Sequence, residues 1–339
     1  MQNKLQKKII FIINGEPLEI YDSFARKHRV GILISLCEKK HIEYEVWTSN
    51  FYHQKKKKFN FKDKIKNSNY RIIDTLGYKK NISISRLIDH IIFAIKFYFQ
   101  FRHIKSKNTI VFSAFPIPEV CFVATLISKK KKIPIVIDIR DQWPDIFYKN
   151  NSNFIKKFFL KFIFSYQTLL NYFTFRNCNA IYSITDNFLN FGLRQRGFSK
   201  NDNNRVFPLA YKKNIFDFNK NLSNHFHEMI KNINFNKINI CFFGVISFKK
   251  FDFNTMIKFL DSQQINSKKF NFIICGSGDD QNRISNFTSE SLHYLDWLNE
   301  TEVSYIANKS DWALANYKPT YDFNLSIPNK IIEYISYGL

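Results

Sequence analysis

Short apolar segments alternate with longer amphipathic segments along this chain, and this alternation constrains the fold more than any other feature. Each apolar segment has the length and the β-branched and aromatic content of a buried strand, whereas the segments between them have helical periodicity. Strands that alternate with helices favour a parallel sheet covered by helices. In the first part of the chain we expect strands at residues 9–14, 44–49, 70–75, 109–114, 133–139, 180–185 and 205–210.

The alternation stops once and then restarts, which indicates two domains. Residues 212–235 are rich in Asn and Lys and show neither strand nor helical periodicity. We therefore expect an N-terminal domain at 1–211, a linker at 212–235 and a C-terminal domain at 236–339, both doubly wound and facing a cleft. The strands expected in the C-terminal domain are residues 238–246, 270–278, 292–298 and 311–317.

The last predicted helix starts at Pro328, a residue favoured at helix starts, and it is followed by Gly338. Lys330 and Glu333 lie on one side of this helix, since residues three apart are neighbours on a helix surface. A doubly wound domain normally continues from such a helix into another strand. We therefore expect the second domain to be incomplete.

The charge balance is strongly basic, with a formal net charge of +23. Such a charge favours an anionic partner, which includes nucleic acid, a membrane surface or a phosphorylated substrate. A genome rich in A and T would also enrich Lys, Phe, Ile and Asn, and this explanation stays open. The five cysteines have no CxxC spacing, so we expect them to be reduced core residues.

The segment IVIDIRDQWPD places charged residues at the end of a predicted strand. In open parallel sheets this edge faces the ligand crevice, and charges there are costly to bury unless they are paired. Asp138, Arg140, Asp141 and Asp145 are therefore candidates for a functional site. The alternative is an ion pair between Arg140 and an aspartate, together with a helix cap by Asp141 or Asp145.

Glycines follow two predicted strands of the second domain. Gly276 and Gly278 stand in IICGSGDD, and Gly244 precedes a loop that contains Lys250. Backbone amides in such turns approach phosphates closely. An ordinary tight turn is the alternative, because neither GxGxxG nor a P-loop motif is present.

No metal site or cofactor is expected. His225 and His227 are two residues apart and have no third ligand nearby in the sequence, and the chain contains no Asp-x-Asp motif.

Two helical segments, at residues 84–105 and 152–176, are rich in aromatic residues but are interrupted by Lys and Arg. The charges argue against a membrane span, whereas a position in the interface of an anionic membrane fits them. The alternative is that both segments bury their apolar sides in the core.

Together these features resemble the bacterial family 4 glycosyltransferases of the GT-B fold that build capsule, O-antigen or exopolysaccharide. The most specific matches are EVWTSNFYHQKKK, LGYKKNISISRLIDH, IDIRDQWPD and PNKIIEYISYGL, which occur in the family's order. The resemblance implies a nucleotide-sugar donor in the C-terminal domain and a lipid-linked, polyprenyl-type acceptor in the N-terminal domain. It also implies retention of configuration, no metal, and a cytoplasmic location on the inner face of the membrane.

The resemblance also assigns residues. Glu333 would bind the donor ribose and Lys330 its phosphates, whereas Leu325 stands where the family has another Glu. The remaining assignments are Gly15, Gly244, Gly276, Gly278 and Lys250 near the donor, Arg29, Arg140 and His53 on the acceptor side, and Asp141 and Asp138 as catalytic candidates.

The sequence thus predicts a retaining glycosyltransferase of cell-surface polysaccharide synthesis. Two alternatives stay open. One is a truncated remnant of such an enzyme, or a half of it that requires a partner. The other is a basic nucleic-acid-binding protein, although no motif for RNA or DNA binding is present.

Overall fold

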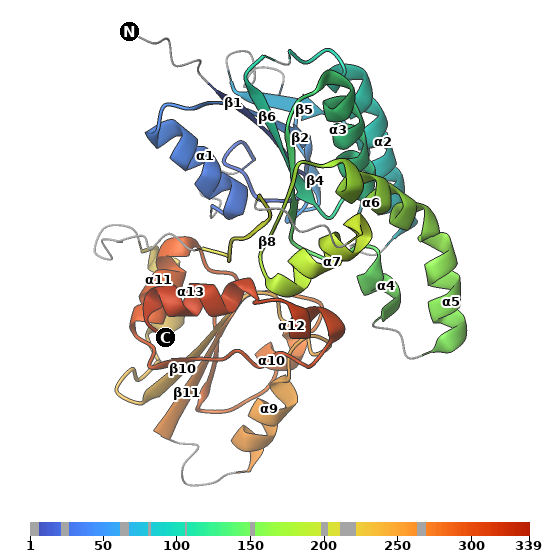
Figure 1. The fold of residues 1–339 in the computed structure, drawn as a ribbon. Helices are drawn as coiled ribbons and strands as arrows, with labels where there is room; N and C mark the ends of the chain where they lie inside the picture. The colour runs from blue at the N-terminus through green and yellow to red at the C-terminus, as the bar shows by residue number, and fades with distance from the viewer. Residues whose placement is uncertain are drawn as a thin grey trace. The chain divides into compact units, whose positions relative to one another are not determined.

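The computed structural model describes residues 7–21, 27–61, 68–80, 83–105, 107–149, 153–197, 203–210, 222–262 and 269–339. The chain divides into two compact units. Unit 1 contains Met1–Ala210 and Asn324–Ser326, and unit 2 contains Tyr211–Phe323 and Ile327–Leu339. Each unit has its own parallel sheet and its own apolar clusters (Figure 1).

Unit 1 is built on a seven-stranded parallel sheet of order β5-β2-β1-β6-β7-β8-β9. The chain order reverses between β1 and β6, and in open parallel sheets ligands bind beside such a switch point. The strands are β1 (Lys8–Ile12), β2 (Glu43–Ser49), β5 (Tyr70–Ile73), β6 (Thr109–Phe115), β7 (Ile135–Ile139), β8 (Ala180–Ser183) and β9 (Arg205–Val206).

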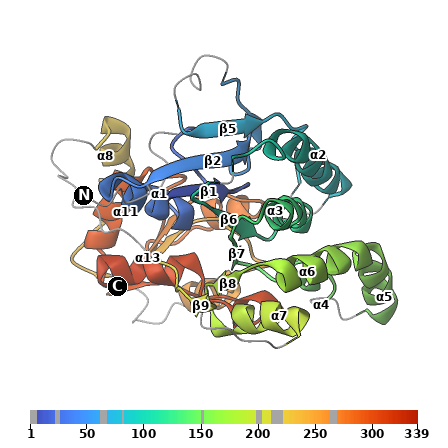
Figure 2. The ribbon, with the colours of Figure 1, turned by 45° about the horizontal axis from the view of Figure 1, so that its top comes forward.

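Helices cover both faces of this sheet, which explains why its strands are continuous apolar runs. The helices are α1 (Arg29–Lys39), α2 (Ile84–Phe101), α3 (Pro118–Lys131), α4 (Asp145–Lys149), α5 (Phe154–Ile163), α6 (Ser165–Asn177) and α7 (Asp186–Arg196). Figure 2 shows α2, α3 and α6 side by side on one face of the sheet.

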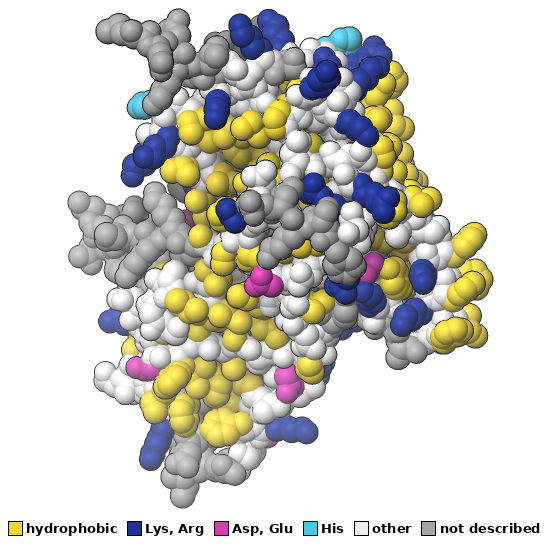
Figure 3. Space-filling model, in the orientation of Figure 1, with side chains coloured by type: hydrophobic (Ala, Val, Ile, Leu, Met, Phe, Trp, Pro, Cys, Tyr) yellow, Lys and Arg dark blue, Asp and Glu magenta, His cyan; other side chains and the backbone are white. Residues whose placement is uncertain are grey.

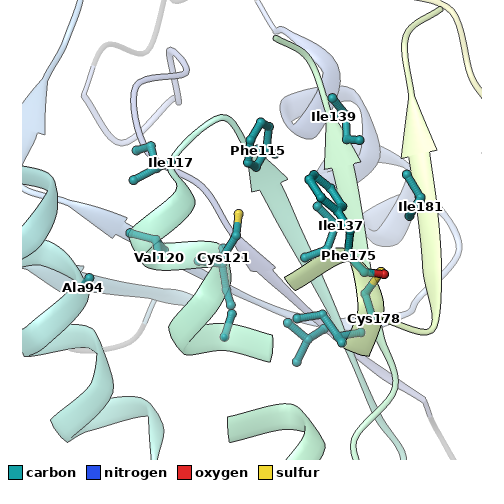
Figure 4. Packing of buried hydrophobic residues seen from close by; sticks show 14 of the residues in the cluster. Ala94, Phe115, Ile117, Val120, Cys121, Ile137, Ile139, Phe175, Cys178 and Ile181 are labelled. Atoms are coloured by element: carbon teal, nitrogen blue, oxygen red, sulfur yellow. The ribbon is translucent and has the colours of Figure 1, made fainter. Parts of the chain in front are cut away.

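Alternate residues of each strand enter different cores, since successive side chains point to opposite faces. Ile10 and Ile12 of β1 join the cluster beneath α2, α3 and α6, whereas Phe11 joins the cluster beneath α1. Figure 4 shows the first of these clusters, in which Cys121 of α3 and Phe175 of α6 point toward the strands β6 and β7.

Unit 2 is built on a four-stranded parallel sheet of order β12-β11-β10-β13. The chain order of its strands reverses between β10 and β13, so this sheet also has a switch point. Its strands are β10 (Ile238–Phe243), β11 (Phe270–Cys275), β12 (Leu292–Tyr294) and β13 (Trp312–Ala313). Its helices are α8 (Asn224–Ile230), α9 (Phe253–Asp261), α10 (Gln281–Ser285), α11 (Glu300–Asn308), α12 (Tyr321–Leu325) and α13 (Asn329–Tyr337), of which α12 ends in unit 1.

The expected fold class is confirmed, because both sheets are parallel and covered by helices, and each expected strand overlaps an observed one. A small antiparallel pair was not expected, namely β3 (Phe51–Tyr52) with β4 (Lys57–Lys58). The cysteines are buried and free, as expected. Part of the segment expected as a linker lies outside the described residues. The rest includes α8, whose Phe226 is fully buried in unit 2.

Among the described residues, no helix is long and apolar enough to cross a membrane. The alternative that both aromatic helical segments bury their apolar sides is wrong for the first part of the second segment, residues 154–163, whereas the second part buries Phe175. This segment forms two helices, and α5 contains no buried residue. In contrast, α2 buries one side, including Phe93, Phe97 and Phe101.

Candidate functional site

At the carboxyl end of β7, Asp138 is fully buried and ion-paired with two arginines. Arg29 of α1 donates from Nε and Nη2 to the Asp138 carboxylate at 2.9–3.1 Å. Arg140 donates from Nε to Asp138 Oδ2 at 2.8 Å. Both carboxylate oxygens are therefore occupied, and the ion pair considered as an alternative for Arg140 is present.

The ion pairs continue to the start of α1 through Glu16, which is also buried. Arg140 donates to Glu16 Oε2, and Glu16 Oε1 accepts from the backbone N–H of Val30 at 2.8 Å and of Gly31 at 3.3 Å. Burial alone would lower the pKa of Arg140, but the carboxylates of Glu16 and Asp138 raise it above its ordinary value. Two carboxylates and two guanidiniums thus connect the loop after β1 with α1 and β7, and each buried charge has a partner of opposite sign.

Asp141 lies just beyond this cluster and is half-buried. Its Oδ1 accepts from the backbone N–H of Gln142 at 2.8 Å, and its Oδ2 accepts from Trp143 Nε1 at 3.2 Å. The guanidinium of Arg86 covers the Trp143 ring at 4.5 Å and interacts electrostatically with Asp141. Asp141 is therefore oriented by its neighbours while part of it reaches the surface.

His53 follows β3 and belongs to a second polar cluster of unit 1. Its Nδ1 lies 2.6 Å from Tyr78 Oη and 3.1 Å from Lys56 Nζ. Burial, together with the charges of Lys56 and Arg86, lowers the pKa of His53 to about 4. Burial and Arg86 lower the pKa of Lys56 to about 8. Because a neutral imidazole is favoured here, His53 is suited to hydrogen bonding rather than to carrying charge.

Gly15 lies in the loop after β1 with φ of 85°, a conformation that favours glycine. Its carbonyl oxygen accepts from Gln54 Nε2 at 2.9 Å. A Cβ built at Gly15 would have the side chain of His53 as its nearest neighbour, at 3.9 Å. The structure thus places Gly15 beside His53 at the end of β1.

Sequence reasoning missed four residues around His53, namely Lys56, Tyr78, Arg86 and His90. His90 is buried, and burial with the charges of Arg86 and His53 lowers its pKa to about 3. These residues stand in two of the four sequence segments that carry the resemblance to the family, but no spacing rule marks them. The resemblance of these segments to the family is the feature of the sequence that could have pointed to the four residues.

In unit 2, the glycines after β10 and β11 let two turns pack against each other. Gly244 and Gly276 have φ of 129° and 138°, and a Cβ at Gly276 would overlap the carbonyl oxygen of Gly244. A Cβ at Gly278 would likewise overlap the carbonyl oxygen of Ile246. Glycine is therefore required at these positions by close backbone approach.

The N–H groups of these glycines are bonded within unit 2. Gly244 donates to the carbonyl of Cys275 at 2.9 Å, and Gly276 donates to the carbonyl of Asp296 at 2.7 Å. Gly278 donates to the side-chain Oε1 of Gln281 at 3.2 Å. The turns are thus preformed by internal hydrogen bonds.

Helix α13 supplies polar side chains to the carboxyl end of β10. Lys330 Nζ donates to the carbonyl of Phe243 at 2.5 Å, and the N–H of Phe243 donates to Tyr334 Oη at 3.2 Å. Since β13 pairs only with Ile240 and Cys241, these side chains satisfy backbone groups that the short edge strand does not reach. Lys330 thus lies where the Gly244 turn begins, and a Cβ at Gly244 would overlap its Nζ.

Glu333 lies one helical turn after Lys330 on α13 and is half-buried. The pKa of Tyr317 is raised by burial and by the charge of Glu333. Lys250 is exposed in the turn after β10, where its carbonyl accepts from the N–H of Lys318 at 2.9 Å. Leu325, at the position of the absent glutamate, belongs to unit 1, where it packs against the large apolar cluster and accepts from Thr185 Oγ1 at 3.0 Å.

Within the described part of the chain, no group of three or more His, Cys, Asp or Glu side chains is arranged to hold a metal ion.

No family model matches the chain, and no curated protein matches its sequence. Solved structures do match over nearly its whole length. The structure of Anabaena HepE (Alr3699) in complex with UDP-glucose is 11% identical, with a TM-score of 0.54 over 98% of this chain and 78% of that one. The apo form of the lipopolysaccharide outer core galactosyltransferase WaaB is 13% identical, with a TM-score of 0.55 over 98% and 79%.

WaaG, a glycosyltransferase involved in lipopolysaccharide biosynthesis, is 11% identical, with a TM-score of 0.56 over 98% of this chain and 79% of that one. At these identities the similarity concerns the fold. The two parallel sheets match those of GT-B glycosyltransferases.

Proposed function

We propose that this protein is a retaining glycosyltransferase that moves a sugar from a nucleotide-sugar donor to a lipid-linked glycan in cell-surface polysaccharide synthesis. One observation carries the proposal most directly. Helix α13 brings Lys330, one helical turn before Glu333, to the carboxyl end of β10, next to the switch point of the unit 2 sheet and the preformed glycine turns. Nucleotides bind at this edge of doubly wound sheets.

The structural neighbours support the choice of donor. HepE has been solved with UDP-glucose, and WaaB is described as a galactosyltransferase. A UDP-sugar is therefore the first donor to test.

On the donor side, we assign the ribose hydroxyls to Glu333, because a carboxylate accepts two hydrogen bonds from a diol. Transfer breaks the bond between the anomeric carbon and the diphosphate oxygen, and negative charge accumulates on the leaving nucleoside diphosphate. Fixed positive charge at that position lowers the barrier. We assign this role to Lys330, which is held at the strand end, with Lys250 as a second, exposed cation.

On the acceptor side, the oxygen of an acceptor hydroxyl forms the new bond to the anomeric carbon and loses its proton, which the leaving diphosphate oxygen accepts. We propose that Asp141 and His53 orient this acceptor, since Asp141 reaches the surface and His53 favours its neutral form. Asp138 has both oxygens bound by arginines, so we assign it a positioning role together with Arg29 and Arg140. No residue of this scheme requires a metal ion.

The donor assignment is tested by titration calorimetry of the purified protein with UDP-glucose and UDP-galactose. We expect saturable binding of at least one donor. The substitution Glu333→Gln should weaken it by roughly tenfold to a hundredfold, because a hydrogen bond to a charged group contributes about 1.5–3 kcal/mol. Asp261→Asn, an exposed carboxylate at the end of α9, serves as the matched control and should bind like the wild type. Equal affinity of the Glu333→Gln variant and the wild type would exclude this role for Glu333.

A further inference from the structure

Two basic side chains of unit 1, Lys56 and Arg86, lie against the same tyrosine ring. Lys56 Nζ is 5.0 Å from the centre of the Tyr78 ring, and the guanidinium carbon of Arg86 is 5.4 Å from it. Lys56 stands in the turn between β3 and β4, whereas Arg86 stands in the first turn of α2. The hairpin and the helix therefore bring two positive charges to one aromatic ring.

Both the charge and the backbone conformation of Lys56 are unfavourable. Burial and the charge of Arg86 lower the pKa of Lys56 to about 8, as a nearby like charge does. Lys56 also has φ of 50°, a left-handed conformation that is uncommon in residues other than glycine. Strained conformations of this kind gather at functional sites. An anion in contact with both cations would offset their repulsion.

The guanidinium of Arg86 is held by two rings. Its carbon atom also lies 4.5 Å from the centre of the Trp143 ring, so that Tyr78 and Trp143 together limit its orientation. A guanidinium can donate two parallel hydrogen bonds to a carboxylate or a phosphate, whereas an ammonium acts as a point charge. Arg86 is therefore suited to set the orientation of an oxyanion, and Lys56 is suited to add charge beside it.

Two carboxylates lie near this pair of cations. The charges of Asp89 and Asp141 both interact with Arg86. Asp89 is fully buried and accepts from the N–H of Gly77 at 2.5 Å, whereas Asp141 reaches the surface. At the surface of the cluster, the positive charges of Lys56 and Arg86 therefore exceed the negative charge of Asp141.

The surroundings of the cluster are basic as well. Lys55, Lys57 and Lys58 flank Lys56 in the sequence and are exposed. On the face of the molecule drawn in Figure 3, basic side chains are spread over unit 1 and acidic side chains are few. A positive surface attracts anions and raises their local concentration.

We propose that Lys56 and Arg86 form a subsite for an oxyanion, either a phosphate or a carboxylate, that the acceptor carries near its reacting hydroxyl. His53, which we assign to the acceptor, has its Nδ1 3.1 Å from Lys56 Nζ. Asp141, which we assign to the acceptor as well, interacts electrostatically with Arg86. An acidic or phosphorylated acceptor sugar is therefore favoured over a neutral one. The link to the acceptor rests on the proposed function, whereas binding of the oxyanion does not.

Titration calorimetry with glucose 1-phosphate, glucuronate and glucose tests the subsite. UDP is present throughout, so that the candidate donor site of unit 2 is occupied. We expect at least one of the two anionic sugars to bind at least roughly tenfold more tightly than glucose, since charge-assisted hydrogen bonds are the stronger ones. The tighter of the two identifies the oxyanion as a phosphate or a carboxylate. If neither anionic sugar bound more tightly than glucose, the proposal would be overturned.

Single substitutions separate the subsite from the general positive charge of unit 1. Lys56→Gln and Arg86→Gln should each weaken the binding by roughly tenfold to a hundredfold, because a hydrogen bond to a charged group is lost. The matched control is Lys57→Gln, which removes the same charge from the adjacent, exposed residue and should change the affinity by less than about twofold. Equal affinities of Lys56→Gln and Lys57→Gln would exclude a specific subsite. Failure of the donor assignment leaves this comparison intact, because all three residues belong to unit 1.

The pKa of Lys56 separates anion binding from a purely structural role. Lysines that carry isotope-labelled methyl groups keep their charge and give NMR signals from which each pKa is measured. The signal of Lys56 is the one that is missing from Lys56→Gln, which is also the decisive variant if Arg86→Gln does not fold. Inorganic phosphate should raise the pKa of Lys56 from about 8 toward its ordinary value of 10.5, because an anion favours the charged form. A pKa that phosphate leaves unchanged would contradict the proposal.

Discussion

The carboxyl ends of the two parallel sheets are organised by different means. In unit 1, charged side chains meet in the interior, where Asp138 is paired with Arg29 and Arg140. In unit 2, glycine turns pack backbone against backbone, and Lys330 binds a carbonyl oxygen. Charges at a strand end are therefore not by themselves evidence of catalysis, since in unit 1 most of them hold the fold together.

The difference between the units also separates positioning residues from residues that can contact a ligand. Asp138 has no exposed surface, whereas Asp141 and Glu333 are half-buried. The buried carboxylate should therefore affect stability first, and the half-buried ones should affect binding first.

The largest effect is expected for Asp138→Asn. Removing this charge leaves two buried guanidiniums with Glu16 as the one carboxylate that pairs with them among the described residues, and breaking a buried ion pair costs about 3–5 kcal/mol. Urea unfolding followed by circular dichroism measures the change. Asp261→Asn, at an exposed site, should stay within about 0.5 kcal/mol of the wild type. If the two variants were equally stable, the ion cluster would not be structural.

A smaller effect is expected for Gly276→Ala in unit 2. The φ of 138° is nearly restricted to glycine and costs about 1–3 kcal/mol for another residue, before the overlap with Gly244 is added. Gly338→Ala is the matched comparison, because Gly338 also has positive φ but no atom within 4 Å of a built Cβ. We expect Gly276→Ala to be clearly less stable than Gly338→Ala in thermal unfolding. The reverse order would mean that the two turns are not packed as described.

The last effect concerns the pH dependence of the stability of unit 1. The folded-state pKa values of His53 and His90 are lowered to about 4 and about 3, mainly by burial. Below the ordinary pKa of 6.5 the unfolded chain binds protons that the folded chain does not bind, so stability falls as pH decreases from 6.5 toward 4. The combined variant His53→Gln and His90→Gln should lose less free energy of unfolding than the wild type between pH 7 and pH 4.5, as measured in urea titrations. If the free energy of unfolding of the variant fell with decreasing pH as steeply as that of the wild type, the two histidines would not be the cause of the pH dependence.

Much of the fold follows from the sequence, because strands buried on both faces are short apolar runs that local patterns reveal. The hairpin of β3 and β4 was missed because its strands are two residues long and Lys57 and Lys58 are exposed. In the candidate site, Asp138 and Arg140 were expected at the end of a strand. Their partner Arg29 is 109 positions away from Asp138, and no local pattern specifies such a pairing.

The sequence left open whether the apolar half of α5 is buried or exposed. Its periodicity indicates an amphipathic helix, but burial depends on which neighbours the tertiary structure places against it. Only the structure shows that α2 buries one apolar side while α5 buries none.

The central claim is that unit 2 binds the nucleotide at the end of β10. Amide hydrogen exchange with and without UDP tests it most directly. We predict slower exchange on UDP binding in residues 244–250, 276–281 and 329–337, with little change in the ion cluster at residues 138–140. No protection by UDP, or protection confined to unit 1, would contradict the account.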